Sequence, residues 1–293
     1  MATEWQGKSK GTVLGYRIFI FLLKKLGIGA AYSLLGFVAL YYCFFSPTST
    51  REVYKYFRER RGRSVGKAMV NVYRNYYVFG QTLIDRVAIS SGLRHRFTYD
   101  FDGIGQIKAL LKKGQGGILI SAHVGNFEIA DHFFDDIDQD SQIYLVTTDA
   151  EHAKIKQYLE SVTVQASIQF ILVQDDLGHI FEIKDALDKG KLVCFTGDRF
   201  FSGQKTMETE FLGETANFPA GPFLLSARLG VPVLFVYVMK EPNRHYHLFA
   251  REAQFAHRKP QQLLESYVKS VTWILDQYPL QWFNYYDFWK ERK

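Results

Sequence analysis

The chain has 293 residues, of which 47% are hydrophobic and 16% aromatic, and its formal net charge is +6 at pH 7. This length allows one large domain or two small ones with a sizeable core, and the two cysteines, Cys43 and Cys194, argue against a disulfide framework and fit a reducing compartment. The positive charge favours an anionic partner, which can be a phospholipid surface, an acidic carrier protein or a nucleic acid.

Residues 26–45 form an uncharged apolar run that is long enough to cross the hydrocarbon core of a bilayer. Basic residues flank this run on both sides, and the larger group follows it, between Arg51 and Lys67. The pattern predicts that residues 1–50 attach the chain to a membrane, either by spanning it or by lying in an anionic leaflet. Residues 51–293 are expected on the cytoplasmic side. The alternative is a buried helical hairpin in a soluble protein. Because the basic residues cluster beside the apolar run and not along a groove, nucleic-acid binding is disfavoured.

The rest of the chain alternates between short apolar segments and segments with helical spacing. Helix is predicted from Arg51 to Gly92, a strand or loop over 99–103 and a short helix over 107–113. Further strands are predicted over 118–121, 143–147, 168–173, 192–196, 233–238 and 246–250, and helices around 155–162, 180–187 and 261–278. The alternation indicates an α/β domain with a largely parallel sheet flanked by helices, preceded by the membrane-associated segment.

Reactive side chains follow two of these predicted strands. His123 comes directly after the strand 118–121, and Asp198 and Arg199 follow the strand 192–196. Because functional sites of open α/β sheets lie beyond the carboxyl ends of the strands, these side chains are expected to meet at one edge of the sheet.

The turn after the first strand also predicts a partner for the histidine. Gly125 and Asn126 open a predicted helix, with Asn126 as its N-cap and Glu128 in its first turn. From there the Glu128 carboxylate can fold back and orient the His123 imidazole, which is the arrangement that a general base needs. A histidine followed five residues later by an acid is common by chance, so a structural histidine is the competing interpretation.

Direct acyl transfer is the simplest chemistry for such a base. A G-x-S-x-G nucleophile motif is absent, and Cys194 lies in a strand that we expect in the core. His123 would then deprotonate an acceptor that attacks an activated acyl carbonyl. Backbone N–H groups near Gly125, or the guanidinium of Arg199, are candidates to stabilise the oxyanion.

Two other interpretations of these residues remain open. Asp198 and Arg199 are equally consistent with a structural ion pair at a loop. A metal site is disfavoured, because the acids and histidine that follow Glu128 are expected to point away from it or to mark an exposed helix end. Its candidate ligands would be His123, Glu128, Asp131, His132 and Asp135.

Four blocks in order resemble the bacterial lipid A biosynthesis acyltransferases, a lauroyl/myristoyl transferase family of the lysophospholipid acyltransferase-like superfamily. AHVGNFE (122–128) is similar to its catalytic block, a histidine with an acid five positions on. GDRFF (197–201) is similar to its second block, and Phe211–Val238 to its third. YPLQWFNYYDFW (278–289) is similar to its closing segment. The resemblance covers nearly the whole chain, and it implies a glycerolipid acyltransferase-type α/β fold.

The resemblance also implies a reaction. The donor would be an acyl chain on acyl carrier protein or coenzyme A, and the acceptor a lipid hydroxyl, without a cofactor, at the cytoplasmic side of the cell inner membrane. His123 and Glu128 map onto the catalytic pair, and Asp198 and Arg199 onto the second block. Contacts with the acyl chain or substrate are expected from Gly125, Asn126, Phe200, Phe201 and Gly221.

One departure from the family pattern affects the oxyanion assignment. Many members carry an arginine between the first two blocks, whereas residues 149–161 here hold Lys154 and Lys156 and no arginine. Lysine does not replace a bidentate guanidinium. A hydrolase, acting on thioesters or with a metal, and a non-catalytic lipid-binding protein are the alternative functions. The identity of the acceptor lipid is left open by the sequence.

Overall fold

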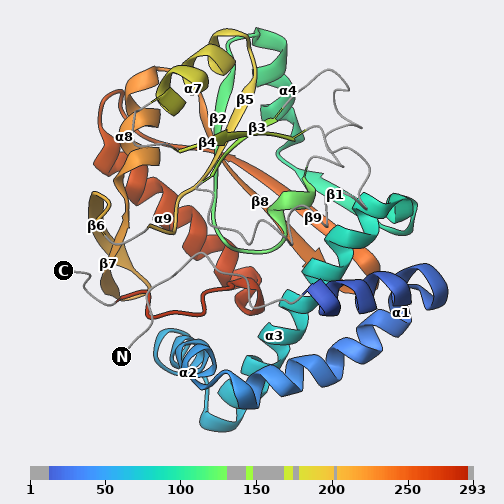
Figure 1. Cartoon of the computed structure of the whole chain (residues 1–293). Coiled ribbons are helices and arrows are strands. Elements are labelled where there is room, and N and C mark those ends of the chain that lie inside the picture. The colour runs from blue at the N-terminus through green and yellow to red at the C-terminus, as the bar shows by residue number, and fades with distance from the viewer. Residues whose placement is uncertain (1–12, 131–142, 148–167, 174–177, 201–202, 290–293) are drawn as a thin grey trace.

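The fold is organised around a seven-stranded sheet (Figure 1). The structure is a computed structural model that describes residues 13–130, 143–147, 168–173, 178–200 and 203–289. Five neighbouring strands run in one direction, and the last two run in the opposite direction. The predicted α/β fold with a largely parallel sheet is therefore confirmed. In spatial order the strands are β4 (Ile168–Leu172), β3 (Ile143–Thr147), β5 (Leu192–Thr196), β2 (Gly117–Ser121), β8 (Val233–Glu241), β9 (His245–Glu252) and β1 (Thr98–Asp102).

The central strands are apolar throughout because helices cover both faces of the sheet. Side chains of β2 alternate between two cores. Ile118 and Ile120 pack into the core on the side of α8 (Ala220–Leu229) and α9 (Pro260–Gln277), whereas Leu119 packs into the core on the side of α4 (Ile104–Lys113). The helix α7 (Gly178–Asp188) contributes to the first of these cores. A strand that is buried on both faces gives the continuous apolar run seen in the sequence.

One hairpin is absent from the sequence-based prediction. Strands β6 (Thr206–Phe211) and β7 (Glu214–Pro219) pair antiparallel in a separate two-stranded sheet. Their turn consists of Leu212 and Gly213, both with positive φ. Leucine rarely adopts this conformation, so the turn lacks the Asn-Gly or Asp-Gly pair by which hairpins are recognised. The helix predicted around 155–162 lies outside the described residues.

The N-terminal part forms a helical layer at one end of the molecule, opposite α4 (Figure 1). It consists of α1 (Val13–Phe45), α2 (Pro47–Lys55), the π turn η1 (Tyr56–Arg60) and α3 (Val65–Ala88), which ends in a second π turn, η2 (Ile89–Leu93). Gly27 has φ 81° and breaks α1 into two helical segments. The segment Lys25–Phe45 is long and apolar enough to cross a membrane.

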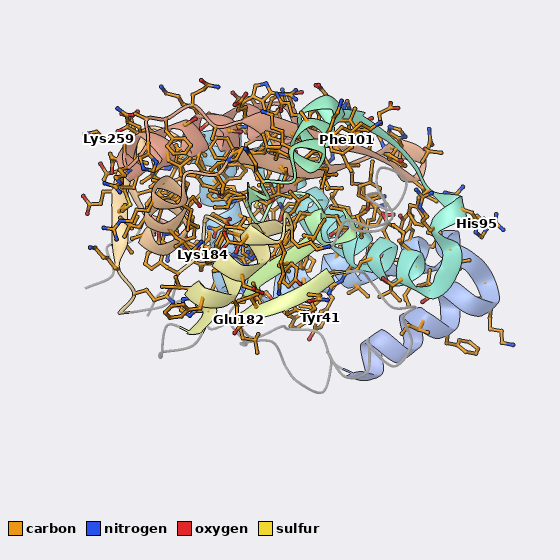
Figure 2. All side chains as sticks on the ribbon, turned by 90° about the horizontal axis from the view of Figure 1, so that it is seen from above. Tyr41, His95, Phe101, Glu182, Lys184 and Lys259 are labelled. Carbon is orange, nitrogen blue, oxygen red and sulfur yellow. The ribbon has the colours of Figure 1, made fainter. Side chains whose placement is uncertain are left out.

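The second segment of α1 has two apolar faces with different environments. Ile28, Ala31, Leu35 and Ala39 recur at helical spacing and are buried, and α1 packs against α3. The opposite face exposes large apolar side chains, and the blue ribbon of α1 lies along the outer side of the molecule in Figure 2. The exposed set is Phe37, Leu40, Tyr41, Phe44 and Phe45.

A buried ion pair joins this helical layer to the sheet. Lys240 Nζ on β8 lies 2.6 Å from Asp85 Oδ2 on α3, and the two side chains are 6% and 0% exposed. The same carboxylate accepts hydrogen bonds from the hydroxyls of Tyr246 (2.5 Å) and Tyr32. Burial and the negative charge of Asp85 raise the pKa of Tyr246 well above its usual range, so this hydroxyl remains a donor. A buried charge pair is retained only where its remaining hydrogen-bonding capacity is satisfied, as it is here.

Candidate active site

The site begins at the end of β2. Beyond this point β8 continues, and its edge on this side has no neighbouring strand. β2 pairs with β8 only as far as Phe235, whereas β8 continues to Glu241. Ser121 Oγ donates to the Val236 carbonyl (2.8 Å), and the Asn126 backbone N–H donates to the Val238 carbonyl (2.7 Å). Buried carbonyls of this kind need partners. The turn after β2 is therefore held against β8 in place of a strand.

The C-terminal segment completes this edge. The side chain of Gln281, in η6 (Pro279–Gln281), accepts from the Lys240 N–H (2.9 Å) and donates to the Lys240 carbonyl (2.7 Å). Its backbone carbonyl accepts from the Gly125 N–H (2.9 Å), and the Phe283 N–H donates to the His123 carbonyl (3.0 Å). The segment that follows α9 thus fixes the turn that carries His123.

His123 is held by a carboxylate that follows the end of the neighbouring strand β5. Its backbone N–H donates to Asp198 Oδ2 (2.9 Å), and its ring Nδ1 lies 2.7 Å from Asp198 Oδ1. The predicted convergence of His123 and Asp198 at the carboxyl edge of the sheet is observed. The His123 side chain is 28% exposed, whereas the Asp198 side chain is 5% exposed. A substrate can therefore reach the imidazole but not the carboxylate.

Electrostatics keep Asp198 ionised. Burial alone would raise the pKa of its carboxyl, but the charge of His123, its ring hydrogen bond, the charge of Arg199 and the His123 backbone N–H outweigh burial and hold that pKa below its usual range. An ionised carboxylate only accepts, so Nδ1 of His123 carries the donated proton. The other ring nitrogen, Nε2, is then the one that can take up a proton.

Gly125 allows the backbone of this turn to lie directly against the backbone of β8. Its φ is +62°, and a Cβ at this position would lie 2.1 Å from the Val238 carbonyl oxygen. No side chain fits at that distance, so the turn requires glycine on both conformational and spatial grounds.

Two expectations about the turn are wrong. Asn126 lies at the N-cap position of η4 (Phe127–Ile129), but its side chain makes no capping hydrogen bond there. It donates instead to the Thr82 carbonyl (3.0 Å) and the Tyr246 hydroxyl (3.3 Å) inside the core. The backbone N–H groups of Gly125 and Asn126 already donate to protein carbonyls, so they are not available to an oxyanion.

The other predicted residues are placed as follows. The backbone of Glu128 lies in the short 3-10 turn η4 (Phe127–Ile129), and its side chain is outside the described part. Arg199 is half-buried, and its Nη2 donates to the Phe283 carbonyl (2.7 Å). Phe200 is buried, and Phe201 is outside the described residues. Gly221 lies in the first turn of α8, where an added Cβ would meet nothing within 4 Å.

The structure agrees with the interpretation of Cys194 as a core residue. The residue is buried in β5, and burial raises the pKa of its thiol to about 12, so it does not supply a thiolate. Among the described residues no three histidine, cysteine or acidic side chains are grouped closely enough to hold a metal ion. Asp131, His132 and Asp135 of the disfavoured metal interpretation lie outside those residues.

Sequence reasoning missed two elements of this site. It named Glu128 as the orienting carboxylate, whereas the described carboxylate on Nδ1 belongs to Asp198. It also missed Asn75 on α3, which is buried and donates to the carbonyls of Leu280 (2.9 Å) and Trp282 (3.0 Å). The positions of the strand ends predict that His123 and Asp198 share an edge of the sheet, but they do not show which carboxylate contacts Nδ1. No local pattern indicates the contacts of Asn75, because they join residues that are far apart in the chain.

A largely parallel α/β sheet with a partly exposed histidine on a buried carboxylate at its carboxyl edge is an arrangement that enzymes use for acid–base chemistry. Comparison with known families gives its relationship. Residues 15–291 match the family described as bacterial lipid A biosynthesis acyltransferase. The chain therefore belongs to this family, as its four sequence blocks indicate, and is an acyltransferase of lipid biosynthesis. Comparison with curated proteins gives no match.

Proposed function

We propose that the protein transfers a fatty acyl chain from an acyl thioester to a hydroxyl group of a lipid acceptor, with His123 as general base. The family implies a donor on acyl carrier protein or coenzyme A. The observation that carries the proposal is the 2.7 Å contact between His123 Nδ1 and Asp198 Oδ1, which fixes the orientation of a ring that is 28% exposed.

The reaction requires no enzyme nucleophile. Nε2 of His123 removes the proton of the acceptor hydroxyl as its oxygen attacks the thioester carbonyl. The tetrahedral intermediate then collapses, the carbon–sulfur bond breaks, and the imidazolium returns the proton to the leaving thiolate. The products are an ester and a free thiol. Asp198 stabilises the imidazolium and keeps the ring in the required orientation.

Charge on the developing oxyanion needs donors other than the engaged backbone groups of the turn. Arg199 is our candidate, because it follows β5 directly after Asp198 and belongs to the second block. Glu128 remains a predicted member of the site. Phe200 and Phe201 remain the predicted contacts of the acyl chain, and Gly125, Asn126 and Gly221 the predicted substrate contacts.

The N-terminal layer supports a membrane location for this reaction. The exposed apolar face of α1 provides a surface that suits a lipid bilayer, and Lys25–Phe45 has the length to enter it. We place the protein at the cell inner membrane, with the catalytic domain on the cytoplasmic side where acyl thioesters are available.

Product analysis separates this function from its alternatives. Purified protein in detergent or vesicles is given a labelled acyl thioester, with and without a lipid acceptor, and with and without a chelator. Direct transfer predicts acylated lipid only when the acceptor is present, no effect of the chelator, and no labelled protein by intact mass. Free fatty acid without acceptor would indicate a thioester hydrolase. Binding of the lipid without any turnover would indicate a lipid-binding protein.

The acceptor is identified by comparing lipids from cells with and without the gene. Mass spectrometry is expected to find one lipid class that lacks a single acyl chain in the deletion strain. An unchanged lipid profile would contradict the proposed role in lipid biosynthesis.

A further inference from the structure

A basic groove lies beside the catalytic turn and takes no part in the proposed chemistry. It has a volume of about 1170 Å³ and lies between α1, the N-terminal half of α3, the turn η5 (Pro242–Arg244) and the segment 277–281. Gln281, which lines the groove, also accepts the Gly125 N–H, so a single residue separates the groove from the turn that carries His123.

The side chains that line the groove carry a net positive charge. Of its lining side chains, five are cationic and one, Glu241, is a carboxylate. Lys240 is paired with Asp85, and Glu241 accepts a hydrogen bond from the Tyr278 hydroxyl (2.6 Å). Within the described part of the chain, the four other cations form no ion pair with a carboxylate, and all four are exposed. They are Arg63, Lys67, Arg74 and Arg244.

These cations converge because of the geometry of two elements. Lys67 and Arg74 are seven residues apart on α3, which places both on the same side of the helix, and Arg63 precedes that helix by two residues. Arg244 faces them from the turn between β8 and β9, where it has φ 60°, a left-handed conformation that disfavours arginine.

Apolar side chains border the groove. Val70 lines it and is 57% exposed, and Val65 and Met69 are exposed on the same turns of α3. Leu26 is exposed on α1, next to the groove residues Ile28 and Gly29. Cations in a concave site bind phosphate oxygens, and exposed apolar side chains beside them enter the acyl region of a leaflet.

We infer that this groove binds the phosphate headgroup of an anionic membrane lipid while the neighbouring apolar side chains enter the bilayer. Charge complementarity and the exposed apolar side chains on α1 and α3 favour a lipid over an acidic protein. The inference rests on the proposed membrane attachment. It does not rest on acyl transfer, because binding of the headgroup uses neither His123 nor Asp198.

Vesicle partitioning with matched variants tests this inference. The groove variant carries Arg63→Gln, Lys67→Gln and Arg74→Gln, and the control carries Lys108→Gln, Lys112→Gln and Lys113→Gln on α4, at the opposite end of the molecule (Figure 1). Both sets are exposed and remove the same charge. Co-sedimentation is measured on phosphatidylcholine vesicles with and without phosphatidylglycerol, after circular dichroism has verified the fold.

The groove variant is expected to lose about 100-fold in partitioning on phosphatidylglycerol vesicles, since each cation near an anionic leaflet contributes about 1 kcal/mol. On pure phosphatidylcholine it should match the wild type, and the control should match it on both. An equal loss in the control would show that binding depends only on the overall positive charge of the protein. No loss in the groove variant would show that the groove does not bind the lipid. Either result overturns the inference.

Two further binding measurements distinguish a lipid from other anionic ligands. Groove-dependent binding of inorganic phosphate with unchanged vesicle partitioning would identify a soluble phosphate ligand, and loss of binding to acidic carrier protein alone would identify a protein-docking surface. Both outcomes overturn the lipid assignment.

Arg244→Gly supplies a second variant that is expected to fold, because glycine favours the conformation that Arg244 adopts. We expect it to lose about fivefold in partitioning on phosphatidylglycerol vesicles while its thermal stability is retained. Unchanged partitioning of this variant would contradict the role of Arg244.

Discussion

At the scale of single residues, the orientation of the His123 imidazole depends on the hydrogen bond from its Nδ1 to Asp198. The imidazole of His123 donates from Nδ1 to only one acceptor at a time, and Asp198 accepts that hydrogen bond from a sealed position at the end of β5. Asp198 also accepts the His123 backbone N–H, so the same carboxylate fixes both the backbone and the ring. Two anchoring points on one residue leave the imidazole little freedom to rotate away from a substrate.

Asp198→Asn is expected to lower the rate of acyl transfer by roughly 10²–10⁴-fold, because an amide neither stabilises the imidazolium nor enforces the tautomer. Steady-state transfer from a labelled thioester measures the effect. Asp185→Asn on α7, an exposed residue paired with Lys189, is the matched control and should retain the wild-type rate. If Glu128→Gln abolishes transfer while Asp198→Asn has little effect, Glu128 is the orienting carboxylate.

The ionisation of Asp198 links stability to pH. Because the folded pKa of its carboxyl lies below the unfolded value, its contribution to folding is present above the unfolded pKa of about 4 and is lost as the pH falls through the folded value. Urea unfolding of wild type and Asp198→Asn should show a stability difference that is steady from pH 7 to about pH 5 and shrinks in more acidic solution. A difference that grows under acid would contradict the lowered pKa.

At the scale of elements, the C-terminal segment acts as a replacement strand. β8 extends beyond β2, and Gln281 satisfies both the N–H and the carbonyl of Lys240 on its open edge. Asn75 on α3 holds the same segment through two carbonyls. A segment far from His123 in sequence therefore determines the position of the turn that carries His123.

Gln281→Ala is expected to lower the free energy of unfolding by about 2–4 kcal/mol, because it leaves a buried donor and a buried acceptor without partners. Urea denaturation measures the change. Gln261→Ala is the control: its side chain bonds the Glu208 carbonyl at the surface, and its loss should cost less than about 1 kcal/mol. Equal costs for both variants would show that Gln281 is not a structural support of the β8 edge.

Local sequence signals account for much of the fold. The strands over 143–147 and 192–196 have the predicted bounds, because a strand buried on both faces is a short apolar run. The β6–β7 hairpin was not predicted because Leu212 and Gly213 do not form a recognisable turn pair. The order of the strands in the sheet also could not be predicted from the sequence. β2 and β5 are neighbours although β3 and β4 lie between them in the chain. The strand ends therefore predict that His123 and Asp198 share one edge of the sheet, but not that the two side chains are in direct contact.

At the scale of the whole molecule, the two faces of α1 have different surroundings. One face packs against α3 and is part of the protein core, whereas the other presents large apolar side chains outward. The site, the basic groove and this outward face are joined through α3 and the segment after α9. Attachment to a bilayer would therefore place the groove and the catalytic turn close to lipid.

The double substitution Phe37→Ser and Phe44→Ser is expected to release protein from vesicles while stability changes by no more than about 0.5 kcal/mol, because both side chains are exposed. Leu35→Ala, on the buried face, should instead lower stability by about 2–4 kcal/mol. Flotation on vesicles and urea denaturation measure the two effects. Retention of the double variant on membranes would argue against α1 as the attachment surface.

The central claim is that the His123 imidazole performs the proton transfer in acyl transfer to a lipid hydroxyl. The most direct measurement is the rate of transfer by purified His123→Gln protein whose unfolding curve matches the wild type. We expect this variant to lose roughly 10²–10⁴-fold in rate while it still binds the donor. A folded His123→Gln protein that transfers acyl chains at the wild-type rate would contradict the central claim.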